Sequence, residues 1–326
     1  MNANRDLNKL AVRPFTADDY ADITRLHNAN FPEFSMSPDE FQFDDSQRVE
    51  PCRLERWVAE CDGRIVGFAH YEQMPQTYHP RKFQLNITVD PEFYGRGIGR
   101  QLYDLVLGEV QQFDPIAVDE WTRSDMTWRV GFLERRGFVE DMRMWTSELD
   151  LTEFDPGQYA AEVAAVEAQG IQIRSWADLG SEDQSVHQRS YEAWLAIRAD
   201  IPIPPNDQRT ETSFDVWWAR TSRPDLLPEG YFVAVAGEQY VGVSNLWHSP
   251  VAGELRTGTT GVRREWRRRG IALALKVRSL EFAKAQGYRC VVTENETNNR
   301  GMIAINDRLG FVKRPAYVHY LKTFET

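Results

Sequence analysis

Two short segments rich in glycine and arginine carry the clearest chemistry in this sequence. They read YGRGIGR at residues 94–100 and RRRGIA at residues 267–272, and an amphipathic stretch typical of a helix follows each one. Backbone N–H groups at the start of a helix are unpaired and attract anions, and glycine lets an anion approach them closely. Arginine adds charge-assisted donors, so the sequence predicts a phosphate site at each segment. The residues concerned are Tyr94, Gly95, Arg96, Gly97, Ile98, Gly99 and Arg100 in the first segment, and Arg267, Arg268, Arg269, Gly270, Ile271 and Ala272 in the second.

Neither segment matches the other common phosphate loops. A Walker loop requires Gly-Lys-Ser or Gly-Lys-Thr after four intervening residues, and neither segment contains it. The dinucleotide-binding fingerprint requires a third glycine three residues after the second, which is also missing. Both of these classes are therefore excluded.

The two segments belong to a sequence repeat. Gly97 corresponds to Gly270 and Phe138 to Phe311, and the difference is 173 residues in both pairs. A constant offset over this distance requires elements of equal length in both copies, which a chance match of one short motif does not produce. We therefore expect a tandem duplication. The predicted parts are an N-terminal domain at 1–152, a connecting segment at 153–170 with a helix from about 156 to 168, and a C-terminal domain at 171–326.

Each copy is predicted to contain the same order of elements. An antiparallel front is followed by a strand, a helix and another strand, which is typical of a mixed α/β domain. The predicted fold is thus two tandem domains, each a mixed, mostly antiparallel twisted sheet flanked by helices. The predicted strands are 11–14, 56–60, 64–71, 83–89, 116–119, 171–174, 231–236, 240–247, 254–262, 289–293 and 316–323, and the predicted helices are 97–112, 125–136, 182–199, 214–220, 270–286 and 299–309.

Composition narrows the class of protein. Hydrophobic residues make up 42% of the 326 residues and charged residues 27%, which is typical of a folded globular chain. Three scattered cysteines exclude a disulfide framework, and their spacing predicts no metal site. A net charge of -11 argues against a nucleic-acid partner. Because residues 1–10 contain no signal sequence and no apolar run is long enough to span a membrane, we expect a cytoplasmic protein.

The two loops and their surroundings resemble the GNAT acyltransferase superfamily. The acyl-CoA loop of that family reads Arg or Gln, two residues, Gly, one residue, and then Gly or Ala. Residues 267–272 fit this pattern completely, and residues 94–99 depart from it only at Tyr94. The segments LERRGF and NDRLGF extend the likeness downstream in both copies. In organisation the chain is similar to the tandem, mycothiol synthase-like members of the family.

The resemblance implies that acetyl-CoA (coenzyme A) binds both loops through its pyrophosphate. It also implies a bulge in the strand before each loop, where the backbone binds the pantetheine arm and the thioester carbonyl. A glycine inside the second of these strands fits this role, because glycine in a strand often marks a bulge. Asn299 and Asn306 are expected beside the pantetheine arm. The predicted bulge residues are Ile87, Thr88 and Val89 in the first copy, and Thr260, Gly261 and Val262 in the second.

Transfer to an amine requires a base, because a free amine is protonated at neutral pH. The second copy offers Glu254 at the start of its bulged strand, Glu294 after the next strand, and His248 at the end of the hairpin. Each also has an ordinary structural interpretation: Glu254 as a solvated turn residue, Glu294 as a cap of the segment 295–299, and His248 as a loop residue. The strand before the first loop has no carboxylate, so catalysis is expected mainly in the C-terminal half. The tyrosine that acts as general acid in many relatives is replaced by Leu133 and by Asn306.

The sequence therefore predicts an acetyl-CoA-dependent N-acetyltransferase that acts on the amine of a small molecule, as a monomer or a homodimer. Two alternatives stay open. One is a non-catalytic sensor or scaffold with two acyl-CoA-binding modules, and the other is transfer of a different acyl group, such as succinyl. The residues do not identify the acceptor.

Overall fold

The computed structural model describes residues 10–180 and 182–324. The segment 1–10 was predicted to lack a signal sequence, and all of it except Leu10 lies outside the described residues. The chain forms two compact units. The described residues of unit 1 are 10–141, 204–211 and 318–324, and those of unit 2 are 142–180, 182–203 and 212–317. These units depart from the expected domains 1–152 and 171–326. The segment 204–211 and the end of the chain belong to unit 1, and the connecting segment belongs to unit 2.

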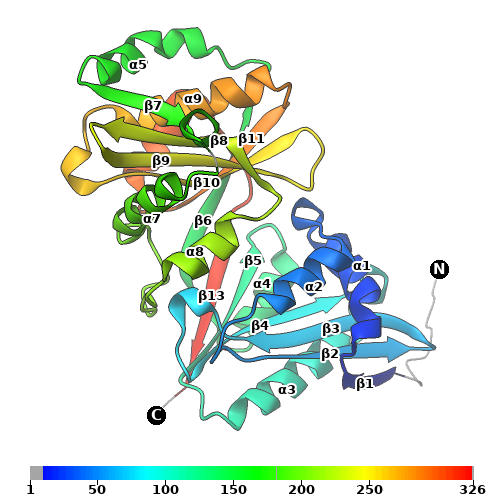
Figure 1. Ribbon diagram of the computed structural model, residues 1–326. Helices are drawn as coiled ribbons and strands as arrows, with labels where there is room; N and C mark the ends of the chain where they lie inside the picture. The colour runs from blue at the N-terminus through cyan, green and yellow to red at the C-terminus, as the bar shows by residue number, and fades with distance from the viewer. Residues whose placement is uncertain (1–9, 181, 325–326) are drawn as a thin grey trace. The chain divides into compact units, whose positions relative to one another are not determined.

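Unit 1 is a twisted sheet with helices on both faces (Figure 1). Its strand order is β1-β2-β3-β4-β5-β13, in which β1 to β4 pair antiparallel and β4 pairs parallel with β5. Helix α3 packs on one face, and α1 and α2 cover the other. Its elements are β1 (Leu10–Pro14), η1 (Ala17–Asp19), α1 (Tyr20–Asn30), η2 (Pro32–Phe34), α2 (Pro38–Ser46), β2 (Leu54–Cys61), β3 (Arg64–Glu72), η3 (Pro75–Thr77), β4 (Lys82–Val89), η4 (Pro91–Phe93), α3 (Ile98–Gln111), β5 (Ala117–Arg123), α4 (Thr127–Glu134) and β13 (Tyr317–Thr323).

Unit 2 has the same layered design. Its strand order is β6-β11-β10-β9-β8-β7, and β12 pairs with β6. Helices α5 and α9 pack on one face, and α7 and α8 on the other. Its elements are β6 (Val139–Asp150, from Met142 on), η5 (Pro156–Tyr159), α5 (Ala160–Glu167), β7 (Ile171–Ser175), α6 (Trp176–Leu179), α7 (Gln184–Arg198), α8 (Phe214–Thr221), β8 (Leu226–Ala236), β9 (Gln239–His248), β10 (Glu254–Val262), η6 (Arg264–Trp266), α9 (Ile271–Ala285), β11 (Cys290–Glu296), α10 (Arg300–Leu309) and β12 (Val312–Lys313).

Most predicted elements are confirmed within a few residues, because the apolar spacing that predicted them is also the spacing of the core. Leu102, Val106 and Val110 follow one another at intervals of four in α3, and all are fully buried. The predicted connecting helix is present as η5 and α5. Strand β6 and helices α1 and α2 are not among the elements predicted from the sequence.

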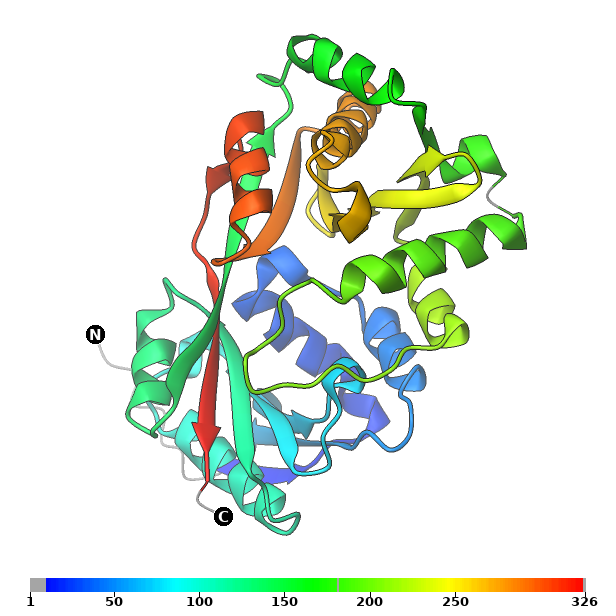
Figure 2. The same ribbon diagram turned by 90° about the vertical axis from the view of Figure 1, so that its left-hand side faces the viewer.

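Each unit is completed by a strand from the other copy. The last strand of the chain, β13, lies beside β5 in unit 1 (Figures 1 and 2), and Val318 and Tyr320 are buried in the core of that unit. Strand β6, which closes the first copy in the sequence, pairs antiparallel with β11 in unit 2 from Met144 to Asp150. The fold of unit 1 therefore depends on the C-terminal end of the chain.

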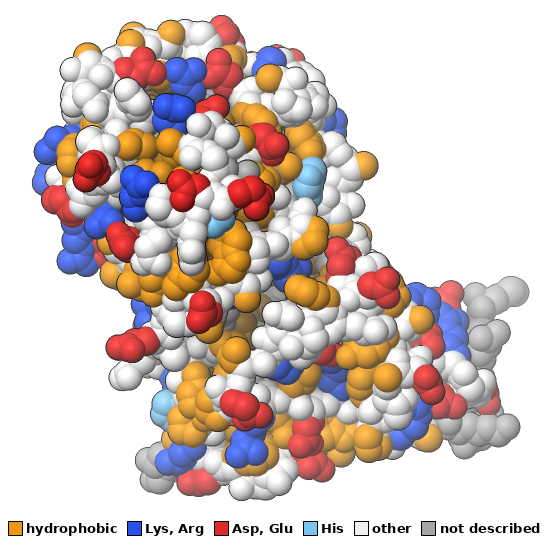
Figure 3. Space-filling view, viewed as in Figure 1, with side chains coloured by type: hydrophobic (Ala, Val, Ile, Leu, Met, Phe, Trp, Pro, Cys, Tyr) orange, Lys and Arg blue, Asp and Glu red, His pale blue; other side chains and the backbone are white. Residues whose placement is uncertain are grey.

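The surface carries both signs of charge. Acidic and basic side chains are interspersed on the face that Figure 3 shows. Among the helices of residues 10–180 and 182–324, none has the length and apolar composition to cross a bilayer.

Candidate functional site

The second glycine loop forms the uncapped start of helix α9. Gly270 is the residue before the helix, with φ +83°, and no side chain caps it. The first helical hydrogen bond runs from the N–H of Ala274 to the carbonyl of Gly270, at 3.1 Å. The N–H groups of residues 271–273 precede that bond, so the helix offers them no acceptor. A left-handed glycine and free amides together create an anion site at the positive end of the helix.

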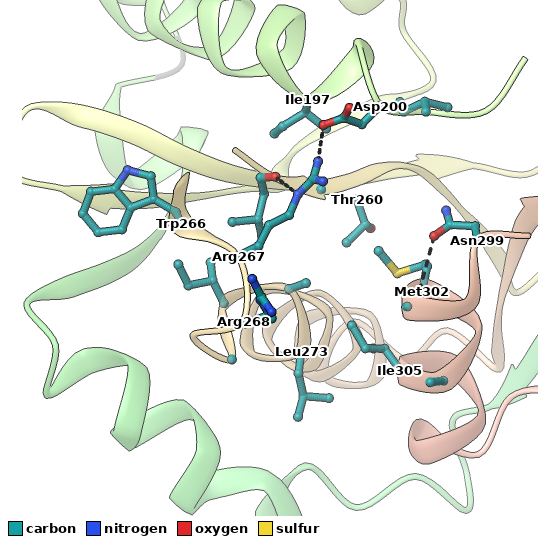
Figure 4. Close-up of a pocket in the computed structure, with 18 of the residues that line it drawn as sticks. Ile197, Asp200, Thr260, Trp266, Arg267, Arg268, Leu273, Asn299, Met302 and Ile305 are labelled. Atoms are coloured by element: carbon teal, nitrogen blue, oxygen red, sulfur yellow. Dashed lines mark hydrogen bonds and ion pairs between the residues drawn. The ribbon is translucent and has the colours of Figure 1, made fainter. Parts of the chain in front are cut away.

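A cavity of about 610 Å³ opens in front of this loop. The end of α7, the end of β10, the loop and α10 surround it, and Asn299, Met302 and Ile305 face it from α10 (Figure 4). The predicted residues that line it are Thr260, Gly261, Val262, Arg267, Arg268, Gly270, Ile271, Ala272 and Asn299. The lining residues that were not predicted include Ile197, Asp200, Ile201, Met302, Ile305 and Arg308.

Arg267 ties the loop to the end of α7. Its Nε donates to the carbonyl of Val262 at 3.1 Å, and its guanidinium also pairs with Asp200 (Figure 4). Asp200 accepts from the Nε of Arg264 at 2.8 Å as well, and hydrogen bonds from Arg264 and then Arg267 lower the pKa of Asp200 to about 2. The guanidinium of Arg267 was expected to serve as a donor for phosphate. In the structure it also positions the loop through these contacts.

The connecting helix supports the same loop from its other side. Nε2 of Gln169 donates to the carbonyl of Arg269 at 3.2 Å. A Cβ added to Gly270 would lie 3.3 Å from Cγ2 of Val166, so α5 packs closely against the loop. The guanidinium of Arg269 stacks over the ring of Trp266, with 4.6 Å to the ring centroid. These contacts fix the direction in which the loop amides point.

Strand β10 has a bulge, but it lies before the predicted positions 260–262, which are themselves regularly paired with β9. Its register with β9 shifts between Thr257 and Thr260, immediately before the predicted residues. A Cβ on Gly261 would lie 2.2 Å from Cγ2 of Ile197, and one on Gly258 would lie 2.3 Å from Oδ1 of Asn245. Only glycine fits at both positions without displacement of a neighbour. Gly261 was predicted from the sequence and Gly258 was not, although both are glycines inside a strand.

The two predicted asparagines have different places. Asn299 caps α10, where its Oδ1 accepts from the N–H of Met302 at 3.4 Å, and it lines the cavity. Asn306 is 3% exposed, and its Nδ2 donates to Oδ1 of Asn295 on β11 at 2.5 Å. Asn306 is not among the described residues that line the cavity, so its visible role is to fix α10 against β11.

None of the three predicted bases lines the cavity among the described residues. Glu254 is buried at the start of β10, where it accepts from Oγ of Ser249 at 2.6 Å. His248 is exposed at the end of β9, with Nδ1 3.2 Å from the hydroxyl of Tyr288. Six residues of extended chain, about 20 Å, separate Glu254 from Thr260. The structure thus keeps Glu254 and His248 together at the strand end remote from the bulge.

Glu294 has a different environment. Strands β10 and β11 pair in parallel at three positions only, ending with Arg256 and Val292. Glu294 lies on β11 two residues beyond this last pair, where the two strands diverge, and it is half-buried. Side chains alternate between the two faces along a strand, so Glu294 lies on the same face as Val292. Val291 lies on the opposite face, in the core that includes α9.

The first loop has nearly the same backbone as the second. Gly97 precedes α3 with φ +87°, and Gly95, which corresponds to Arg268, has φ +75° against the +61° of Arg268. The guanidinium of Arg96 stacks on Phe93 as that of Arg269 stacks on Trp266. Ile98 is buried, whereas Gly99 is half-buried and Arg100 exposed.

Two exposed aromatic side chains contact each other at the first loop. The ring of Tyr94 lies 4.5 Å from that of Trp128, which corresponds to Gly301 in the second copy. The hydroxyl of Tyr94 donates to Oδ1 of Asn30 at the end of α1, at 2.5 Å. Tyr94 thus ties its loop to a helix end as Arg267 does, with a neutral hydrogen bond in place of an ion pair.

The predicted bulge of the first copy is absent from the structure. Strand β4 pairs with β3 in unbroken register from Gln84 to Val89, which includes Ile87 and Thr88. Every residue of this segment therefore has an ordinary ladder partner on β3. Leu133, which replaces the general-acid tyrosine of many relatives, is fully buried in the core of unit 1.

The family follows from a comparison with known sequences. Residues 20–138 and 191–311 match the profile described as the acetyltransferase (GNAT) family, so both copies are covered. The chain belongs to the GNAT acetyltransferase family. As a GNAT enzyme it carries out acetyl-CoA-dependent N-acetyltransfer, and enzymes of this family act on small-molecule amine acceptors. Its tandem organisation and its mixed α/β fold are confirmed.

Several proteins are similar to this chain over most of its length. A mycothiol acetyltransferase of Streptomyces scabiei is 25% identical over 250 residues, which cover 76% of this chain and 73% of that protein. One from Acidothermus cellulolyticus is 22% identical, covering 80% and 76%. Among solved structures, a tandem GNAT protein from the clavulanic acid biosynthesis pathway has a TM-score of 0.74 at 20% identity, covering 97% and 98% of the two chains. A GNAT protein of Sphaerobacter thermophilus has a TM-score of 0.66 at 22% identity, covering 97% and 96%.

Proposed function

We propose that this GNAT enzyme binds acetyl-CoA in the cavity of unit 2 and transfers the acetyl group there. The observation that carries the proposal is that the uncapped start of α9 and the end of β10, just after its bulge, face one cavity. Its volume, about 610 Å³, falls within the range of small-molecule sites. The amides of residues 271–273 would hold the pyrophosphate, and the backbone of 260–262 and Asn299 would hold the pantetheine arm.

We propose Glu294 as the group that takes the proton of the acceptor amine, directly or through a water molecule. Its support is its position on the diverging part of β11, whereas Glu254 and His248 lie at the remote end of the sheet. In the transfer, the amine nitrogen forms a bond to the acetyl carbon, the carbon–sulfur bond breaks, and the thiolate leaves with a proton. An unprotonated nitrogen is required for the first of these steps.

The acceptor is proposed to be a small-molecule amine, taken up by a monomer or a homodimer without a nucleic acid. The relatives named mycothiol acetyltransferases support a small molecule as acceptor. The two alternatives make different predictions. A sensor or scaffold binds acetyl-CoA but releases no thiol with any amine, and an enzyme for another acyl group turns over succinyl-CoA faster than acetyl-CoA.

The test is thiol release from acetyl-CoA with a panel of amines, for the wild type and two glutamine variants. Glu294→Gln keeps the shape and removes the base, so kcat is expected to fall about 10²-fold or more. Glu254→Gln is the matched control, and its kcat is expected to stay within a factor of about three. The opposite ranking would move the base to Glu254, and full activity of both variants would move it to another residue, with His248 the next candidate.

A further inference from the structure

A second cavity lies within unit 1 and is lined by none of the residues of either glycine loop. Its volume is about 150 Å³, roughly that of five water molecules or one small organic molecule. Strands β4, β5 and β13, the loop around η3 and the segment 204–211 contribute to its wall. Its polar and aromatic lining includes Lys82, Gln84, Asp119, Trp121, Asp207 and His319.

His319, from the last strand of the chain, is held between two carboxylates. Its Nε2 lies 3.2 Å from Oδ1 of Asp119, its Nδ1 lies 3.2 Å from Oδ2 of Asp141, and its side chain is 3% exposed. Burial alone would lower the pKa of His319, but the hydrogen bond and charge of Asp119 and the charge of Asp141 raise it overall. With a carboxylate at each nitrogen, both ring nitrogens act as donors and the ring carries a positive charge.

The wall itself carries two cations, Lys82 and His319, and two carboxylates, Asp119 and Asp207. Lys82 pairs with Asp207 at 3.0 Å. His319 contacts Asp119 from the wall and also Asp141, which is not among the described lining residues. Because Asp141 matches the one charge of His319, the cluster retains the negative charge of Asp119, and a ligand with one positive charge would neutralise it.

Asp119 has an oxygen available for such a ligand. The Nε2 of Gln84 donates to Oδ1 of Asp119 at 3.0 Å, and the contact with His319 also involves Oδ1. Within the described part of the chain, Oδ2 of Asp119 therefore has no hydrogen-bond partner. Trp121 lines the same cavity, with its ring 5.0 Å from the ring of His319. A carboxylate oxygen beside an aromatic ring suits an ammonium group.

The wall is closed by the segment that enters unit 1 from the second copy. The N–H of Thr210 donates to the carbonyl of Gln76 at 2.9 Å, and the N–H of Tyr78 donates to Oγ1 of Thr210 at 2.9 Å. Pro204 and Asp207 of the same segment line the cavity directly. The cavity is therefore an ordered pocket with hydrogen-bonded walls.

We propose that this pocket of unit 1 binds a small primary ammonium compound, whose nitrogen donates to Oδ2 of Asp119 beside Trp121. The site is separate from the acetyl-CoA cavity of unit 2, and the proposal does not depend on the proposed function. The described residues that line it include none of either glycine loop, so the proposal is one of binding and includes no acetyl transfer.

The test is calorimetric titration of the full chain with n-propylammonium chloride, and with n-propanol as the neutral analogue. We expect one site for the ammonium ion and at least about tenfold weaker binding of the alcohol. Asp119→Asn keeps the shape of the side chain and is expected to weaken ammonium binding about tenfold or more. Asp104→Asn, an exposed position on α3, is the matched control and is expected to bind as the wild type.

Two further variants keep the proposal falsifiable. Trp121→Leu leaves the pair of Asp119 and His319 intact, and it is expected to weaken binding several-fold even if Asp119→Asn fails to fold. Gly270→Glu is expected to remove acetyl-CoA binding in unit 2 and to leave ammonium binding unchanged, so the failure of one proposal is distinguishable from the failure of the other. Equal binding of the alcohol and the ammonium ion, unchanged binding by the Asp119 and Trp121 variants, or loss of ammonium binding with Gly270→Glu would each overturn the proposal.

Discussion

The two glycine loops of this GNAT enzyme share a backbone and differ in the space before it. Both loops start a helix from a left-handed glycine, Gly97 or Gly270, with no side-chain cap. A cavity of about 610 Å³ lies before the second loop, whereas Tyr94 and Trp128 stack before the first. An anion site is thus a local property of a helix start, but a cofactor site also requires that neighbouring elements leave room for the rest of the molecule.

The strands before the two loops also differ, because only the second one is bulged. Strand β10 is bulged between Thr257 and Thr260, whereas β4 is regularly paired from Gln84 to Val89. A bulge turns backbone groups away from the ladder and makes them available to a ligand, and a regular strand does not. We therefore infer that unit 2 holds the working acetyl-CoA site and that unit 1 binds acetyl-CoA more weakly.

The strongest test of this difference is a matched pair of glutamate substitutions. Gly270→Glu and Gly97→Glu place the same carboxylate at equivalent left-handed positions, so backbone strain is alike in both. We expect Gly270→Glu to weaken acetyl-CoA binding at least about 10³-fold, roughly 4 kcal/mol, and to abolish turnover. Gly97→Glu should remove only the weaker binding of acetyl-CoA by unit 1. Calorimetry on both variants measures this, and loss of turnover with Gly97→Glu would reverse the roles of the two units.

A second test exchanges the residues at one equivalent position. Gly301→Trp introduces the side chain that closes the first loop, and we expect it to weaken acetyl-CoA binding about 10²-fold, roughly 3 kcal/mol. A Cβ at Gly301 has no neighbour within 4 Å, so the helix accommodates the substitution. The reverse change, Trp128→Gly, removes the aromatic ring beside the first loop and is expected to strengthen acetyl-CoA binding by unit 1. If titration shows no change with either variant, the aromatic pair is not what separates the two sites.

A third test concerns the helices behind the loops. Lys276 on α9 occupies the position of Tyr103 on α3. Nζ of Lys322 donates to the hydroxyl of Tyr103, whereas Nζ of Lys276 is buried with no hydrogen-bond partner in the described part of the chain. Burial lowers the pKa of Lys276 to about 7. Lys276→Met removes this buried amine, and we expect it to raise the free energy of unfolding at pH 7 by about 2 kcal/mol.

The stability gain of Lys276→Met is expected to depend on pH, and linkage gives the direction of the change. A lysine with a lowered pKa binds fewer protons folded than unfolded between pH 7 and its unfolded value of about 10.4, so it makes stability rise with pH in that window. The advantage of Lys276→Met over the wild type should therefore shrink from pH 7 to pH 9. Denaturant melts at both values measure it, with the exposed Lys313→Met as control. An advantage that does not change with pH would show that Lys276 acts through packing alone.

The order of elements could be predicted from the sequence, because glycine and the apolar spacing act locally. Leu102, Val106 and Val110 identify α3 without knowledge of its partners. The closure of the first loop could not be predicted, because it depends on contacts of Tyr94 with Asn30 and Trp128, which come from two other helices.

Pairing between strands that are distant in the sequence could not be predicted either. The segment 316–323 was predicted as a strand, but nothing local indicates that it completes unit 1 rather than unit 2. For the same reason the position of His319 beside Asp119 could not be predicted. The candidate site was predicted best where one short segment makes it, at residues 260–262 and 267–272, and least well at Asp200 and Ile197, which the fold brings to it from α7.

The smallest expected effect tests how far the two loop backbones are alike. Arg268 has φ +61°, a left-handed conformation that costs a residue with a side chain about 1 kcal/mol, whereas the first loop has Gly95 there. Arg268→Gly relieves this strain, but glycine also gains freedom in the unfolded chain, so we expect a net stabilisation of only about 0.5 kcal/mol. Gly95→Ala should destabilise the chain by about 1 kcal/mol, because it adds the same strain to unit 1. Thermal melts of both variants measure the two effects. A destabilising Arg268→Gly would mean that contacts of the arginine side chain outweigh its backbone strain. The enzyme would then keep Arg268 for the structure of its loop, and not only for its charge at the mouth of the cavity.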